Sequence, residues 1–182
     1  MKIVDTDIPD VKIVEPRVFG DERGFFYESF NFRVFKELTG LEVDFVQDNH
    51  SLSNRGVLRG LHYQIRQPQG KLVRVVRGKV FDVAVDIRRS SADFGKWVGE
   101  YLSAENFRQM WIPPGFAHGF LVIEDGTEFL YKTTDYYAPE YERAIRWNDP
   151  EIAIEWPVGG IELVLSDKDA NGTSLVDAEL FP

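Results

Sequence analysis

Two residues that could take part in chemistry, one a cation and one a titratable group, lie in one strand-like stretch, RGVLRGLHYQ at 55–64. Arg59 supplies a cation, and His62 supplies an imidazole, a group whose charge changes near neutral pH. Both are costly on a half-apolar strand unless they bind or pair with something. Because they differ by three positions, they leave opposite faces of an ideal strand. We expect a distortion at Gly56 or Gly60 that brings both to one ligand.

The other two histidines are His50 and His118. His118 lies in WIPPGFAHGF, where two prolines and a glycine predict a turn before an aromatic strand. A single histidine is more often structural than catalytic. His62 and His118, however, each lie just inside a predicted strand, which favours their convergence on one barrel interior.

The elements around these residues are short strands separated by turn signals roughly every ten residues. Asp125-Gly126 is a two-residue hairpin signal. One helix is predicted over 32–38, with Ser29 or Asn31 as its N-cap and Gly40 as its end. Strands are predicted at 11–20, 25–30, 43–53, 55–64, 71–76, 80–87, 97–102, 107–112, 116–123 and 127–135. This pattern predicts an all-β sandwich or barrel.

Length and composition bound the range of functions. The 182 residues fit a single domain spanning 1–182, with a C-terminal segment wrapped around it from Pro139. The net charge of −9 argues against non-specific binding to nucleic acid or to acidic membranes, but allows a local basic pocket for a small anion. Cysteine is absent, which excludes disulfides and thiol nucleophiles. With no signal-like or membrane-spanning run, we expect a cytoplasmic protein.

One motif resembles the metal-binding cupins. Residues 113–120, PPGFAHGF, match the second cupin motif, in which a histidine follows a Pro-x-Gly turn. The first cupin motif offers two histidines separated by one residue, but here the second position is Gln64. Lys71 lies near the place of an acidic ligand, and an ammonium cannot bind a metal. We therefore predict that the protein binds no metal and needs no cofactor.

Six stretches together resemble the dTDP-4-dehydrorhamnose 3,5-epimerase family over nearly the whole chain. They read RGxFxESF (23–30), QDNHSLSxxGVLRGLHYQ (47–64), QGKLVRVxxGxVxDVxVDIR (69–88), IPPGFAHGF (112–120), YKxTDYYxPExE (131–142) and SDKD (166–169). The resemblance implies a cupin-type jelly-roll β-sandwich or barrel with a few short helices. It also implies a homodimer in which the Arg23 region contributes to the partner's site.

The implied reaction converts dTDP-4-dehydro-6-deoxy-D-glucose to dTDP-4-dehydro-L-rhamnose, a step of dTDP-L-rhamnose synthesis. Protons leave and return at carbons 3 and 5, which requires a base, an acid and a stabiliser of the enolate oxygen. The resemblance assigns these roles to His62 with Asp169 as its partner, to Tyr131 and to Lys71. The implied substrate-binding residues are Arg23, Phe26, Glu28, Gln47, Asn49, Arg59, His118, Tyr137, Glu142 and Lys168.

The same residues also fit plainer interpretations. Without the resemblance, Asp169 fits a surface turn, Tyr131 a packing residue and Lys71 a guard on a strand edge. A related enzyme could invert only one carbon. Two rival hypotheses are a metal-dependent cupin oxygenase or isomerase and a non-catalytic sugar-binding or storage cupin. A structure with Asp169 beyond hydrogen-bonding reach of His62 would contradict the mechanism.

Overall fold

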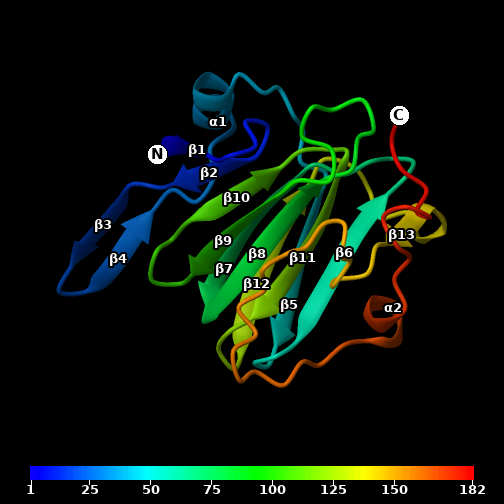
Figure 1. Cartoon of the computed structure of the whole chain (residues 1–182). Coiled ribbons are helices and arrows are strands. Elements are labelled where there is room, and N and C mark those ends of the chain that lie inside the picture. The colour runs from blue at the N-terminus through cyan, green and yellow to red at the C-terminus, as the bar shows by residue number, and fades with distance from the viewer.

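Two antiparallel sheets form the body of the protein, whose computed structural model describes all 182 residues (Figure 1). The first sheet consists, in order, of β1 (Lys2–Asp5), β2 (Lys12–Glu15), β10 (Gln109–Ile112), β7 (Lys71–Arg77), β12 (Thr127–Thr133) and β5 (Gln47–Ser53). The second consists of β13 (Glu142–Ala144), β6 (Leu58–Gln64), β11 (Phe116–Val122), β8 (Lys79–Asp86) and β9 (Trp97–Ser103). A separate hairpin, β3 (Val18–Asp21) with β4 (Gly24–Tyr27), extends away from this body (Figure 1).

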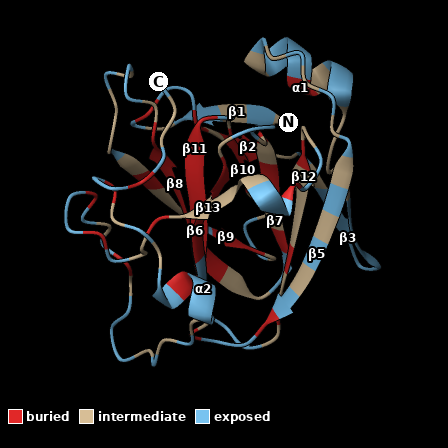
Figure 2. Ribbon diagram, turned by 90° about the vertical axis from the view of Figure 1, so that its right-hand side faces the viewer, coloured by how far each residue is buried: buried red, intermediate tan, exposed pale blue.

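The inner faces of the two sheets share one apolar core. Val73 on β7, Phe120 on β11 and Phe129 on β12 belong to a single buried cluster that also includes residues of β2, β8, β9 and β10. Burial of such side chains is the main contribution to the stability of a β-sandwich. Figure 2 shows the buried residues concentrated along the central strands, with β11 buried throughout.

Successive side chains of strand β8 lie on opposite faces of its sheet, and the polar side chain of Asp82 lies on the inner face. Val80, Asp82 and Ala84 point to the interior, whereas Phe81 and Val83 belong to a second apolar cluster on the outer face of the sheet. The C-terminal segment covers that outer face, so every residue of β8 except Lys79 is buried.

The C-terminal segment approaches the barrel closely at Gly56. Gly56 has a φ of +87°, and a Cβ there would lie only 2.1 Å from the carbonyl oxygen of Glu162. Only glycine therefore fits at this position. Farther along, the segment forms the four-residue helix α2 (Asp167–Ala170), where the sequence suggests only a polar turn.

The one helix predicted from the sequence is present as α1 (Phe32–Thr39). Asn31 caps it by accepting a hydrogen bond from the amide of Val34, and Gly40 ends it in the left-handed conformation with a φ of 72°. The prediction of a hairpin at Asp125-Gly126 is wrong. This turn joins β11 to β12, which belong to different sheets, so the chain crosses between the sheets instead of pairing with itself.

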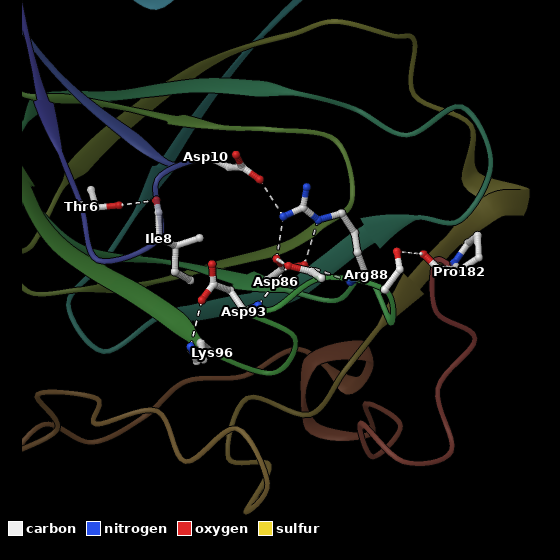
Figure 3. A network of polar contacts seen from close by, with 10 residues as sticks. Thr6, Ile8, Asp10, Asp86, Arg88, Asp93, Lys96 and Pro182 are labelled. Atoms are coloured by element: carbon white, nitrogen blue, oxygen red, sulfur yellow. Dashed lines mark hydrogen bonds and ion pairs between the residues drawn. The ribbon is translucent and has the colours of Figure 1, made fainter.

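A polar network anchors the loop between β1 and β2, and also the C-terminus, to the connection between β8 and β9 (Figure 3). Arg88 donates to the fully buried carboxylate of Asp86 at 2.6 and 3.0 Å and to Asp10 at 2.7 Å. The hydroxyl of Ser90 donates to the carbonyl oxygen of Pro182 at 3.0 Å. The loop between β1 and β2 and the C-terminus are thus held at the same place.

Candidate active site

A β-bulge in β6 turns Arg59 and His62 toward the same cavity. His62 pairs with His118 and Arg59 pairs with Phe120, so three residue steps of β6 match two steps of β11. The irregularity contains Gly60, which has a φ of +123°. An extra residue shifts the alternation of side chains by one, which puts both groups on the inner face. The distortion expected from the sequence is thus confirmed at Gly60.

The cavity lies between the two sheets, has a volume of about 350 Å³ and is lined mainly by polar side chains. Of the 14 lining residues only three are hydrophobic, which suits a polar, hydrogen-bonding ligand. The lining residues are Gln47, Asn49, Ser51, Arg59, His62, Gln69, Lys71, His118, Gly119, Phe120, Tyr131, Tyr137, Glu142 and Lys168. Ser51, Gln69, Gly119 and Phe120 are not among the predicted site residues, and no chemical signal in the sequence marks them.

His62 is paired with Asp169, as predicted. Its Nε2 lies 2.7 Å from Oδ1 of Asp169, a carboxylate carried by α2 and 5% exposed. The same carboxylate accepts hydrogen bonds from the Gly60 amide at 3.0 Å and from the Ser166 hydroxyl at 2.6 Å. Burial alone would raise the pKa of Asp169, but these hydrogen bonds, led by that of His62, hold it well below its ordinary value.

The pair fixes the tautomer of His62. An ionised carboxylate only accepts hydrogen bonds, so the proton of the neutral ring resides on Nε2. Nδ1 is then the nitrogen with a free lone pair. The arrangement is that of a general base with an orienting carboxylate behind it.

A second histidine–carboxylate pair lies deeper in the cavity wall. Nε2 of His118 is 3.0 and 3.1 Å from the two carboxylate oxygens of Asp82, which is completely buried. Burial raises the pKa of Asp82 and lowers that of His118, and the attraction between the two opposes both shifts. Nothing in the sequence selects Asp82, because polar residues of an alternating strand normally face water.

Lys71 faces the same region of the cavity from β7. Burial lowers the pKa of its ammonium to about 8, although the nearby carboxylates of Asp82 and Glu142 oppose the shift. The group is a poorly hydrated cation, and such a cation interacts strongly with a negative charge that develops nearby.

Tyr131 projects into the cavity from β12, where it pairs with Asn49 of β5. Burial raises the pKa of its hydroxyl, the negative charge of Glu142 adds to the rise, and Arg59 opposes it. The phenol is therefore protonated at neutral pH and is able to donate a proton.

Near the mouth of the cavity, a chain of contacts joins Tyr137, Glu142 and Lys168. The Tyr137 hydroxyl donates to Glu142 at 3.1 Å, and the ammonium of Lys168 donates to the other oxygen of the same carboxylate at 2.9 Å. Together with Arg59, Lys168 and Lys71 give the cavity three cationic side chains in a protein of net charge −9. Cations grouped in this way suit a phosphorylated ligand.

Three of the predicted binding residues lie elsewhere within the single chain. Arg23 and Phe26 are on the β3–β4 hairpin, and Glu28 follows it. Arg23 pairs with Asp21 on the same hairpin, and Phe26 is 72% exposed. None of the three lines the cavity of its own chain.

Metal binding would require several ligating side chains to come together. No group of three or more histidine, cysteine or carboxylate side chains is placed to hold a metal ion. Gln64, at the position of a second cupin histidine, uses its amide in hydrogen bonds to the backbone of two loops. Absence of a metal remains a prediction.

The helices of the protein can be compared with the length and apolar character that a membrane span requires. None of them combines the length and the apolar character needed to cross a membrane.

Comparison with known proteins relates the whole chain to one family. A family profile described as dTDP-4-dehydrorhamnose 3,5-epimerase matches residues 5–177. A protein of that name from Pseudomonas aeruginosa is 65% identical over 182 residues, covering 100% of both chains, and one from Shigella flexneri is 63% identical, covering 100% of this chain and 99% of the other.

Solved structures agree with the sequence comparison. The crystal structure of dTDP-6-deoxy-D-glucose-3,5-epimerase from Legionella pneumophila, in complex with dTDP-4-keto-L-rhamnose, superposes with a TM-score of 0.95 at 56% identity. The match covers 98% of this chain and 94% of that one. The predicted all-β, cupin-type fold is confirmed. On these grounds the chain belongs to the dTDP-4-dehydrorhamnose 3,5-epimerase family of isomerases.

Proposed function

We propose that this protein converts dTDP-4-dehydro-6-deoxy-D-glucose to dTDP-4-dehydro-L-rhamnose without a cofactor, as a step in dTDP-L-rhamnose synthesis. The observation that carries the proposal is the His62–Asp169 pair at 2.7 Å, opening onto a cavity that also contains Tyr131 and Lys71. These are a base, an acid and a cation, the three groups that proton exchange beside a ketone requires.

Each step follows from the chemistry of these side chains. Nδ1 of His62 takes the proton from carbon 5 or carbon 3, and the electrons of that C–H bond form the enolate with the carbonyl at carbon 4. The imidazolium is stabilised by Asp169, and the enolate oxygen by the ammonium of Lys71. Tyr131 returns a proton to the opposite face of the carbon, which inverts its configuration. The imidazolium of His62 then gives its proton to solvent and the Tyr131 phenolate takes a proton from solvent, which resets both groups. The same steps at the second carbon complete the double inversion.

The nucleotide part of the substrate is held by the remaining polar groups. Arg59 and Lys168 bind the diphosphate, and the exposed ring of Tyr137 stacks on thymine. Gln47, Asn49, His118 and Glu142 line the same cavity and complete its polar wall.

The protein is also proposed to act as a homodimer. Phe19, Phe25 and Phe26 are 52%, 63% and 72% exposed on a hairpin that extends from the body (Figure 1), an arrangement typical of an arm that packs on a partner. The arm would carry Arg23, Phe26 and Glu28 to the partner's cavity. The expected cytoplasmic location stays a prediction.

The reaction is tested by incubating dTDP-4-dehydro-6-deoxy-D-glucose with the enzyme in heavy water and locating deuterium by NMR. Deuterium at both carbons 3 and 5 is expected. Deuterium at only one carbon would establish a single-carbon epimerase, and deuterium at neither carbon would refute the proposal. Bound metal that is lost together with activity would instead support a metal-dependent cupin.

The dimer is tested by mixing two inactive variants, His62→Ala and Arg23→Ala. In a mixed dimer one cavity has both an intact His62 and an intact Arg23 from the other chain. If Arg23 acts across the interface, random exchange restores activity at about one quarter of the sites. Absence of recovery in a proven mixed dimer would place Arg23 outside the partner's cavity.

A further inference from the structure

The segment Asp135–Ala138 carries Tyr137 to the mouth of the cavity, and its residues 135–137 lie outside the backbone hydrogen bonding of the sheets. It connects β12 to the short 3-10 helix η1 (Pro139–Tyr141). The amides and carbonyls of residues 135–137 form no hydrogen bond to other backbone groups. Because unpaired backbone groups are costly where water is displaced, other groups must position this segment.

Three glutamine side chains from three different parts of the chain supply those contacts. Gln47 accepts a hydrogen bond from the amide of Tyr137 at 3.0 Å. Gln69 donates to the carbonyl of Asp135 at 2.9 Å, where the hydroxyl of Thr133 is a second donor. Gln64 accepts from the amide of Ala138 at 2.9 Å and donates to the carbonyl of Tyr136 at 3.2 Å.

Gln64 differs from the other two glutamines because it lies outside the lining of the cavity. It is 4% exposed and does not line the cavity, so it has no contact with a ligand bound there. Its amide nitrogen also donates to the carbonyl of Gln67 at 2.8 Å, so a single buried side chain ties two loops together. Its effect on a ligand must therefore pass through the loop that it holds.

The ring of Tyr137 is fixed at its other end as well. Its hydroxyl donates to Glu142 at 3.1 Å, and Glu142 is in turn bound by Lys168 at 2.9 Å. The residue is nevertheless 53% exposed and lines the cavity. A flat ring held at both its backbone and its hydroxyl, with an open face at the cavity mouth, is a preformed surface for an aromatic base.

We propose that Gln64 is a positioning residue that orders the Tyr137 ring before the nucleotide arrives and thereby sets the affinity for a nucleoside diphosphate without touching it. The inference rests on the proposed function in one respect, namely that the base stacks on Tyr137. A surface that is ordered in advance strengthens binding because less freedom is lost when the ligand binds. Gln64 has no contact with the reacting carbons, so it acts on binding and not on the chemical step.

The test is Gln64→Met, which has nearly the same length but makes none of the three hydrogen bonds. Loss of an ordered stacking surface weakens binding of the base, and the tenfold effect expected here corresponds to about 1.4 kcal/mol. We expect KM, and the Kd of dTDP measured by calorimetry, to rise about tenfold, with kcat within twofold of the parent. Gln67→Met is the matched control, because the Gln67 side chain is exposed and forms no hydrogen bond.

A double-mutant cycle shows whether the effect passes through Tyr137. In a Tyr137→Ala background, Gln64→Met should add no further increase in KM, because the surface that Gln64 orders is gone. An undiminished tenfold increase in that background, or a loss in kcat as large as the change in KM, would overturn the proposal. If Gln64→Met does not fold, Gln64→Glu keeps the acceptor for the Ala138 amide while losing both donated bonds, and the same criteria apply to it.

Hydrogen exchange separates this inference from the proposed function. The Ala138 amide should be protected in the parent protein and exposed in Gln64→Met, with or without nucleotide. Failure of the parent to bind dTDP would refute the proposed function and the stacking role of Tyr137. Equal protection of Ala138 in parent and variant would overturn the positioning role of Gln64 even if the enzyme is active.

Discussion

Replacing Asp169 with asparagine removes a negative charge from beside His62 with little change in side-chain shape. The asparagine oxygen is able to keep the position of Oδ1, which accepts from Gly60 and contacts His62, while its amide nitrogen faces the Ser166 hydroxyl. The tautomer of His62 is therefore retained. What is lost is the attraction between the carboxylate and the imidazolium that forms when the substrate proton is taken.

The size of the loss follows from the distance and the burial. A hydrogen bond to a charged group contributes about 1.5–3 kcal/mol, and opposite charges 4 Å apart at an effective dielectric constant of 20 attract by about 4 kcal/mol. Asp169 is 5% exposed and His62 is 23% exposed, so water screens the pair only partly. A rise of about 3 kcal/mol in the barrier corresponds to a fall in kcat of about 100-fold.

The assay measures initial rates of deuterium incorporation at carbons 3 and 5 under saturating substrate. Asp167→Asn serves as the control, because Asp167 lies on the same short helix and is exposed. Thermal unfolding of both variants shows whether α2 stays in place. A folded Asp169→Asn enzyme that retains kcat within threefold of the parent would refute the assignment of Asp169 as the partner of the base.

Two further effects on catalysis and two on stability follow from the same structure. Tyr131→Phe should still exchange deuterium but fail to invert the carbons, so product with wild-type turnover would count against Tyr131 as the acid. Because burial lowers the pKa of Lys71 in the free enzyme to about 8, kcat/KM should fall as the pH rises through 8. In Lys71→Arg the decline should move to higher pH, since a guanidinium keeps its proton, and an unchanged pH profile would exclude Lys71 as its source. A Cβ at Gly60 would lie 2.5 Å from a backbone carbon of β11, so Gly60→Ala should lower the free energy of unfolding by about 3 kcal/mol in urea titrations, whereas Gly159→Ala, with open space around it, should not. Folding lowers the pKa of Asp169 below its usual 3.8, so the stabilisation from its ionised form is complete above about pH 4 and is lost as the pH falls further; acid titration of Asp169→Asn should therefore show a weaker dependence on pH in that range.

Local features of the sequence predict local features of the fold. The helix α1 is predicted with Ser29 or Asn31 as its cap and Gly40 as its end, because capping depends on residues that are neighbours in the chain; the structure selects Asn31. The pair Asp125-Gly126 correctly predicts a turn but not the partners of the strands on either side. Turn chemistry specifies that the chain reverses, whereas the choice between two sheets depends on packing elsewhere in the molecule.

In the candidate site, too, local features are predicted from the sequence, whereas features that depend on packing are not. A distortion at Gly56 or Gly60 is expected because the side chains of Arg59 and His62 would leave opposite faces of an ideal strand, and the bulge at Gly60 provides it. Asp82 is not predicted, because an alternating pattern defines two faces of a strand without saying which face the rest of the chain covers. In the sequence, Gln64 is notable only because it occupies the position of a second cupin histidine. Its positioning role is not predicted, because its three hydrogen bonds go to loops that are distant in sequence or irregular in conformation.

The His62–Asp169 pair also determines when during synthesis the enzyme can become active. The two residues are 107 positions apart, and ribosomes add about 5–20 residues per second, so the base is made roughly 5–20 s before its partner. By the end of that interval the nascent chain holds every strand of both sheets but still lacks the carboxylate. A translation product that stops before α2 would lack both the carboxylate partner of His62 and the cavity residue Lys168, and it would not exchange substrate protons at the normal rate.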